Sequence, residues 1–255
     1  MARRATAIAR LRQTAQGSVL VLDSGDTLFK RSTAAIPTDS TLGALPIAAM
    51  NAMGYDAMAL GTMDLAPIPV VTARFEEADF PVLSANVGPD GALPNVQPYL
   101  LRRVEGHTFA IIGVTAQVAG QRAQAYEMGL TIGDPVDAVR RTVKEVRDRA
   151  DIIILLGNLD QEMNVSLARE VAGIDVIVGV YRSGQIRAAT IDGPEGTVVL
   201  QASGIQGEYL GILSLHFDAA GRVVSFAGQA LPLTADSYAD SPEMTRLMHE
   251  YATTP

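Results

Sequence analysis

The sequence contains no cysteine and no tryptophan, and only three histidines: His107, His216 and His249. The absence of cysteine excludes disulfides, thiolate metal ligands and cysteine nucleophiles. Long apolar runs are also absent, because no stretch approaches the roughly 20 residues that a membrane-spanning helix needs. The three histidines are scattered along the chain, and we expect each of them to be a solvated or core residue.

Basic charge is scarce as well, since 20 Lys and Arg stand against 28 Asp and Glu, for a net charge of −8. Nucleic-acid binding needs a basic face, so we expect no nucleic-acid partner, and we expect no membrane partner either. Residues 1–4 are basic, but no long apolar stretch follows them, which is not the pattern of a signal peptide. We therefore expect a cytoplasmic location for the chain as written, or a periplasmic or secreted one if a leader has been removed.

The bulk composition is that of an ordinary globular protein, with 255 residues, 48% of them hydrophobic and 19% charged. In the first two thirds, apolar runs and amphipathic segments alternate. Helices are predicted over 3–14, 44–53, 68–78, 134–149 and 161–172, and strands over 19–22, 57–60, 81–85, 152–156 and 176–179. Glu105-Gly106 lies between two further apolar runs, 99–104 and 108–114, which indicates a hairpin.

The last third changes character and is mostly β. Four successive antiparallel strands are predicted, with Gly193, Gly204 and Gly221 at their turns, over 186–191, 198–202, 210–217 and 222–228. A closing helix follows Ser241. The whole pattern predicts a single domain over residues 1–255, an α/β sandwich built on more than one sheet.

Six segments carry a family resemblance: 21–27 (VLDSGDT), 50–61 (MNAMGYDAMALG), 80–87 (FPVLSANV), 150–156 (ADIIILL), 175–179 (DVIVG) and 207–211 (GEYLG). In this order they resemble the N-terminal domain of the 5'-nucleotidase/2',3'-cyclic phosphodiesterase family of metallophosphatases. The resemblance covers essentially the whole chain. It implies the four-layer α-β-β-α sandwich of the metallo-dependent phosphatase type. It also implies that the family's C-terminal nucleotide-binding domain is absent.

The chemistry of that family needs two divalent metals, which activate a water and clamp the phosphate. The family holds them with carboxylates, an amide and imidazoles from five short motifs. The first is an Asp-x-His on the opening strand, and the chain begins too late to contain it, so we expect the first strand to be missing. The second is a Gly-Asp whose acid bridges the metals, and it is retained as Gly25-Asp26.

The other three motifs are altered. In place of Gly-Asn-His-Glu, Leu-Ser-His and Gly-His-x-His, the chain has GTMD at 61–64, LGN at 156–158 and VYRS at 180–183. The resemblance thus leaves Asp26, Asp64 and Asn158 as vestigial metal positions, with none of them assigned as a metal ligand. The residues of the degenerate site pocket are Thr62, Met63, Tyr181 and Arg182.

Three weak oxygen ligands do not make a two-metal site, so no cofactor is expected; the alternative is one divalent magnesium or calcium ion. Asp26 is interpreted as a turn residue that bonds its own backbone, and Asp64 and Asn158 as loop residues with local backbone bonds. Arg182 either replaces the lost positive charge by pairing with Asp26 or Asp64, or points to solvent.

No catalytic residue is predicted. The leading interpretation is a catalytically inactive relative that acts as a binding or structural module. The alternative is a weak or altered metal-dependent phosphoesterase that uses Asp26, Asp64 and Asn158 around one metal. A missing first strand would leave a sheet edge unpaired. We therefore expect a homodimer, association with a related complete enzyme through that edge, or local rearrangement around residues 19–22.

Overall fold

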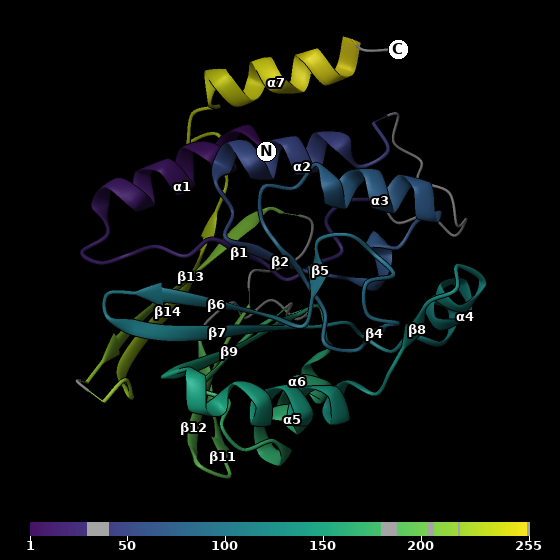
Figure 1. Cartoon of the computed structure of the whole chain (residues 1–255). Coiled ribbons are helices and arrows are strands. Elements are labelled where there is room, and N and C mark those ends of the chain that lie inside the picture. The colour runs from purple at the N-terminus through teal and green to yellow at the C-terminus, as the bar shows by residue number, and fades with distance from the viewer. Residues whose placement is uncertain (30–40, 180–187, 203–206, 219, 254–255) are drawn as a thin grey trace.

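The computed structural model describes residues 1–29, 41–179, 188–202, 207–218 and 220–253. These residues form four layers in the order helix, sheet, sheet, helix (Figure 1). The layering is the sandwich that the alternation of helices and strands predicted. In the described part of the chain, no helix is long and apolar enough to cross a membrane.

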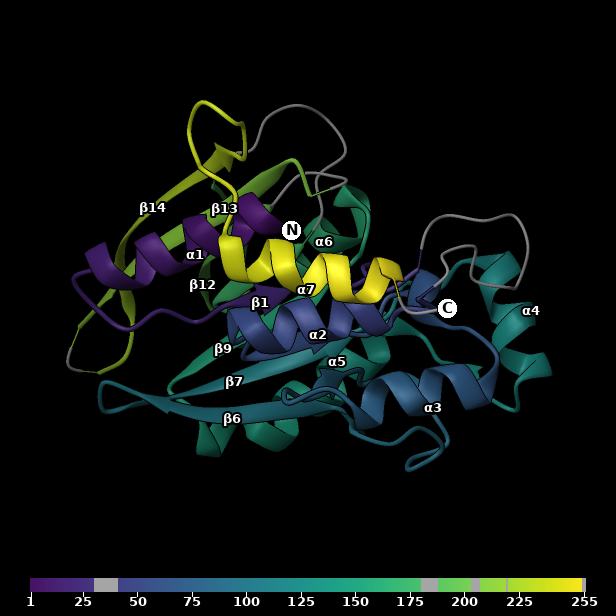
Figure 2. The ribbon, with the colours of Figure 1, turned by 90° about the horizontal axis from the view of Figure 1, so that it is seen from above.

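The first sheet is parallel throughout and short-stranded. Its strands, in spatial order, are β1 (Leu22–Asp23), β2 (Ala57–Ala59), β3 (Val82–Leu83) and β5 (Val96–Gln97). Three helices cover its outer face: α1 (Ala2–Thr14), α2 (Ala44–Met53) and α3 (Ile68–Glu76) (Figure 1). The closing helix α7 (Pro242–Thr253) lies outside them, against α1 and α2, as Figures 1 and 2 show.

The second sheet is larger and mixed. Its strands, in spatial order, are β11 (Ala189–Gly193), β12 (Gly196–Ala202), β10 (Val176–Gly179), β9 (Ile152–Gly157), β7 (His107–Val114) and β6 (Tyr99–Val104). Helices α5 (Pro135–Val146) and α6 (Gln161–Glu170) cover its outer face (Figure 1). Every residue of β9 is buried, as expected for a strand covered on both faces.

Smaller elements complete the chain. An antiparallel ribbon is formed by β13 (Tyr209–Phe217) and β14 (Val223–Pro232). The remaining pieces are the β4 (Val87–Gly88)–β8 (Thr131–Ile132) pair, helix α4 (Ala119–Glu127), and the short turns η1 (Thr62–Asp64) and η2 (Arg147–Arg149). The sequence patterns did not predict α4, β4, β5 or β8, because these segments are short and carry little apolar periodicity.

Local signals in the sequence locate several element ends correctly. The Asp134 side chain accepts a hydrogen bond of 3.0 Å from the Asp137 N–H and so caps α5. Gly54 ends α2 in the left-handed region, with φ 65°. Glu105 and Gly106 both have positive φ, 49° and 92°, as the tight turn between β6 and β7 requires.

Two expectations for the strands need correction. The four last strands are not simply successive and antiparallel, because β12 pairs in parallel with β10 and so brings the β11–β12 hairpin into the second sheet. The strand predicted over 19–22 is reduced to β1, which has β2 as its one neighbour among the described residues. Whether a partner covers the other edge of β1 stays a prediction. Gly204 and residues 186–187 lie outside the described ranges.

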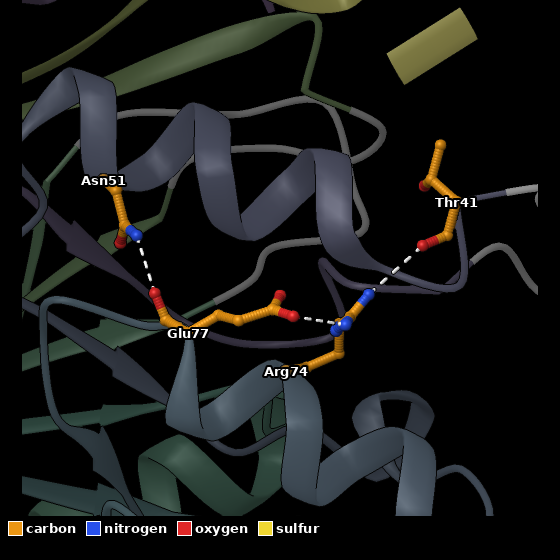
Figure 3. Close-up of polar contacts among 4 residues, drawn as sticks. All are labelled: Thr41, Asn51, Arg74 and Glu77. Atoms are coloured by element: carbon orange, nitrogen blue, oxygen red, sulfur yellow. Dashed lines mark hydrogen bonds and ion pairs between the residues drawn. The ribbon is translucent and has the colours of Figure 1, made fainter. Parts of the chain in front are cut away.

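Polar contacts tie α2 to α3 on the outer layer. Asn51 Nδ2 donates to the Glu77 carbonyl at 2.8 Å, just past the end of α3 (Figure 3). Arg74 donates to the Thr41 carbonyl at 3.3 Å and forms an ion pair of 2.5 Å with the Glu77 carboxylate (Figure 3). The Glu77 and Thr41 carbonyl groups thus accept hydrogen bonds from side chains of the neighbouring helices. The bond to Thr41 also holds the segment before α2 against α3.

The two sheets approach each other closely at Gly113 of β7. A Cβ atom on this glycine would lie 2.2 Å from the backbone carbon and oxygen of Leu83 in β3. Backbone atoms of a central strand cannot move aside cheaply, so only glycine fits here. The close approach lets apolar residues of both inner faces share one core, among them Ala57, Ile111 and Leu156.

Replacing Gly113 with Ala is therefore expected to lower the free energy of unfolding by about 3 kcal/mol, through overpacking. Urea unfolding followed by circular dichroism would measure the change. Gly120→Ala is the matched control, because its Cβ meets nothing within 4 Å and it lies in helix α4, where alanine is expected to stabilise by up to about 1 kcal/mol. Equal effects of the two substitutions would contradict this packing.

Candidate functional site

Asp26, Asp64 and Asn158 meet at one edge of the two sheets. Asp26 follows β1, Asp64 lies in the turn after β2, and Asn158 directly follows β9. The carboxyl ends of parallel strands bring residues distant in sequence to one place, which is where open α/β sheets build their sites. These residues do lie in loops or a short turn, but the expectation of purely local bonds is wrong. Asp64 accepts N–H groups 36 to 38 residues away, and Asn158 bonds to Asp26 across 132 residues.

The Asp64 carboxylate is the centre of this arrangement. Its side chain is fully buried, at 0% exposure. Oδ2 accepts the N–H of Asp26 at 2.7 Å and that of Gly61 at 2.9 Å. Oδ1 accepts the N–H of Thr27 and that of Leu28, both at 2.8 Å. Four backbone donors from two loops thus converge on one side chain.

Asp26 occupies the space beside it. Its φ of 59° places it in the left-handed region, which is uncommon for a residue other than glycine. Its Oδ1 accepts the N–H of Met63 at 2.8 Å, and its Oδ2 accepts Nδ2 of Asn158 at 2.7 Å. A Cβ on Gly61 would lie 2.2 Å from both N and Oδ1 of Asp26, so glycine is required opposite it.

Three carboxyl groups lie at the site: Asp64 is buried, and Asp23 and Asp26 are half-buried. Burial, followed by the charge of Asp26, raises the pKa of Asp64 to about 8, against the lowering effect of the Leu28 and Gly61 N–H groups. Burial also raises the pKa of Asp23. Asp23 Oδ1 accepts the Gly25 N–H at 2.9 Å and the Thr27 hydroxyl at 2.7 Å.

Arg4 supplies positive charge to the same region, which the sequence patterns did not reveal. Burial acts to lower its pKa, but interactions with Tyr55 and Asp23 outweigh burial, and the net effect is a raised pKa. Burial raises the pKa of Tyr55 as well. Arg4 lies in α1 among other arginines, so nothing in the sequence distinguishes it from a solvated helix residue.

The remaining predicted pocket residues divide into two groups. Thr62 is buried and Met63 is half-buried, both in η1 beside Asp64. Tyr181 and Arg182 lie outside the described residues, so the pairing of Arg182 with an acid stays a prediction. The three histidines are elsewhere, in β7, β13 and α7.

The described residues do not fit a two-metal centre. Within the described ranges, no group of three or more His, Cys, Asp or Glu could hold a metal ion. Both oxygens of Asp26 and of Asp64 accept protein N–H groups. Since a carboxylate can only accept, Asn158 must present its NH2 to Asp26, which turns its oxygen away. We therefore derive no metal-dependent step from this site.

The chain is similar in sequence to nucleotidases and nucleotide phosphoesterases. No protein-family profile matches the chain. It is 30% identical to the 5'-nucleotidase of Homo sapiens, over 92% of this chain and 44% of that protein. It is 24% identical to the trifunctional nucleotide phosphoesterase protein YfkN of Bacillus subtilis, over 98% of this chain and 19% of that one. The chain spans less than half the length of these relatives.

Solved structures show the same architecture. The 5'-nucleotidase precursor from Thermus thermophilus superposes with a TM-score of 0.82 at 25% identity, over 98% of this chain and 52% of that one. The calcineurin-like phosphoesterase YfkN from Bacillus subtilis superposes with a TM-score of 0.78 at 21% identity, over 99% and 88%. The predicted four-layer sandwich of the metallophosphatase type is confirmed.

Asp64→Ala is expected to lower the free energy of unfolding by at least about 3 kcal/mol, because each buried N–H left without an acceptor costs about 1–3 kcal/mol. Asp134→Ala is the matched control, since it removes one acceptor at a helix cap and should cost about 1 kcal/mol. Urea unfolding of both variants would test this. Similar losses in the two would show that Asp64 is not the centre of the arrangement.

The raised pKa of Asp64 also predicts a pH dependence. Between its ordinary value of 3.8 and about 8, the folded chain binds a proton that the unfolded chain has released. The contribution of Asp64 to the free energy of unfolding is therefore lost as the pH rises from 3.8 to about 8. Measured against Asp64→Asn, whose side chain does not titrate, the wild type should lose relative stability from pH 4 to pH 8. A constant difference, or one that grows with pH, would mean that the N–H groups keep Asp64 ionised.

Proposed function

We propose that this homologue of the 5'-nucleotidases and of YfkN-type nucleotide phosphoesterases is catalytically inactive and acts as a binding or structural module. A fold carries an activity only where its site is intact. Here the residues at the retained site positions are engaged with one another and with the backbone. The contacts of those residues therefore support the proposal. The shared fold indicates common ancestry with those enzymes and does not by itself indicate their activity.

The hydrogen bonds of Asp26 and Asp64 carry the proposal. For Asp64 to bind a cation, it would have to release N–H groups in a fully buried place. Each such N–H would be left unsatisfied, at a cost of about 1–3 kcal/mol per group. Asp26 already accepts the Met63 N–H and the Asn158 amide, so a cation at Asp26 would lie beside two donors that face the same carboxylate. The network thus favours the arrangement without a metal.

The competing function is a weak phosphoesterase that holds one magnesium or calcium ion at Asp26, Asp64 and Asn158. Those cations take six or more oxygen ligands in proteins, or keep several waters. The Asn158 side chain would have to rotate so that its oxygen faces Asp26, and its present bond to Asp26 would be lost. This competing function therefore requires a rearranged site.

A module of this kind would act through its surface. One proposed role is that of a partner subunit for a related complete enzyme, with a contact at the edge of β1 that has no strand neighbour among the described residues. Hydrolysis would then depend on the partner. Co-purification with such an enzyme would support this role.

Elemental mass spectrometry on the protein purified without chelator is expected to find close to no divalent metal per chain. Nucleotides and other phosphate esters, supplied with magnesium, manganese or zinc, should not be hydrolysed above a protein-free control. Asp26→Asn should leave both results unchanged, as should Asp134→Asn, a control that alters a helix cap away from the site. One tightly held metal per chain, together with hydrolysis that Asp26→Asn alone abolishes, would establish the phosphoesterase instead.

A further inference from the structure

The β13–β14 ribbon carries no formal charge. β13 is nine residues long and β14 is ten, and neither contains an Asp, Glu, Lys or Arg. Charged residues make up 19% of the whole chain, so their absence from two long strands with many exposed positions is unusual. The charged residues of the hairpin, such as Asp218 and Arg222, pair with each other at its turn.

One side of the ribbon is attached to the body of the protein. Leu213, Leu215 and Phe217 of β13 pack against the core between the sheets, and the ring of Phe109 meets that of Phe217 edge-on at 5.6 Å. The β14 strand lies on the outer side of β13 (Figure 2). Among the described residues, β13 is its one strand neighbour.

The outer strand is long, apolar and exposed. Val224 is 63% exposed and Phe226 is 37% exposed. Natural proteins protect such edges with charged side chains, proline or bulges, because free N–H and C=O groups attract another strand. Here the register leaves one extra residue, Val224, in β14 opposite the step from His216 to Phe217, so a bulge lies near the start of β14, and Pro232 ends the strand. Residues 225–231 lie between these two features and contain no charge, no proline and no bulge.

We propose that β14 is the interface between two copies of this chain, paired antiparallel about a two-fold axis. A strand paired with its own copy in this way offers the same set of donors and acceptors twice, so the contact is self-complementary. The two ribbons then form one four-stranded sheet. The interface closes on itself, because each β14 has one edge without a strand neighbour in the part of the chain that the structure describes.

The distribution of charge favours a second copy of this chain as the partner, and the uncharged ribbon as the place where it binds. At a net charge of −8, the surface of one copy repels that of another over most of its area. The uncharged ribbon is the place where two copies can approach without that repulsion, and it has no charge with which to select an oppositely charged partner. The free edge of β1 was the expected place for a homodimer, but it spans two residues against the ten of β14.

Light scattering coupled to size exclusion tests the interface. The wild type is expected to have twice the single-chain mass of 26.9 kDa, with dissociation on dilution. Val224→Lys places a charge on the exposed edge without disturbing the core, so it should give folded monomers. Val118→Lys is the matched control, since Val118 is also apolar and is 46% exposed away from the ribbon, and it should stay dimeric.

Single cysteines provide a second and independent readout, because the chain has none of its own. Ser225, Ala227 and Gln229 lie on one face of β14, and a cysteine near the two-fold axis would meet its own copy. At least one of these variants should form a disulfide-linked dimer in air. Tyr126→Cys, on a side chain that is 78% exposed in α4, should not.

Three results would overturn the proposal. The first is a wild type that stays monomeric at every concentration. The second is a dimer that Val224→Lys leaves intact, since this would place the interface elsewhere. The third is cross-linking through Tyr126→Cys as fast as through the β14 cysteines. None of these results bears on whether the protein hydrolyses phosphate esters, so this proposal and the proposed function can fail separately.

Discussion

The buried carboxyl group of Asp64 is the constraint on which the site depends. It draws the N–H groups of residues 26–28 and of Gly61 to one point, and so joins the loops that follow β1 and β2. That junction holds Asp26 in the left-handed region and allows its own carboxylate to reach Met63 and Asn158. The first sheet is made of strands two or three residues long, which form few ladder bonds of their own. Side-chain acceptors of this kind therefore contribute much of the order at this end of the sandwich.

The sequence predicts the parts of the fold that depend on local chemistry. The Asp134-Pro135 pair marks the start of α5, and Gly54 marks the end of α2, because capping and left-handed geometry require those residue types. The strand order is not local: β12 pairs in parallel with β10, although pattern alone made it one of four antiparallel strands. Helix α4 was missed because its nine residues have little amphipathic character.

The sequence pointed to three residues of the candidate site but not to their bonding, and Tyr181 and Arg182 lie outside the described residues. Motif positions gave Asp26, Asp64 and Asn158, and the structure brings the three together. Their hydrogen bonds could not be predicted, because the donors are backbone groups placed by the meeting of distant loops. Arg4 and Asp23 were missed for the same reason, since an arginine in a basic helix and an acid after a short strand look like solvated residues. On a scaffold shared with 5'-nucleotidases, Asp26 and Asp64 thus hold loops together.

Anomalous diffraction from crystals grown in excess manganese would test this account most directly. We expect no anomalous peak beside Asp26, and we expect the Asn158 amide and the Met63 N–H to stay bonded to its carboxylate. A manganese ion within direct bonding distance of Asp26 and Asp64, with Asn158 rotated to present its oxygen, would contradict it and would make the site a metal centre.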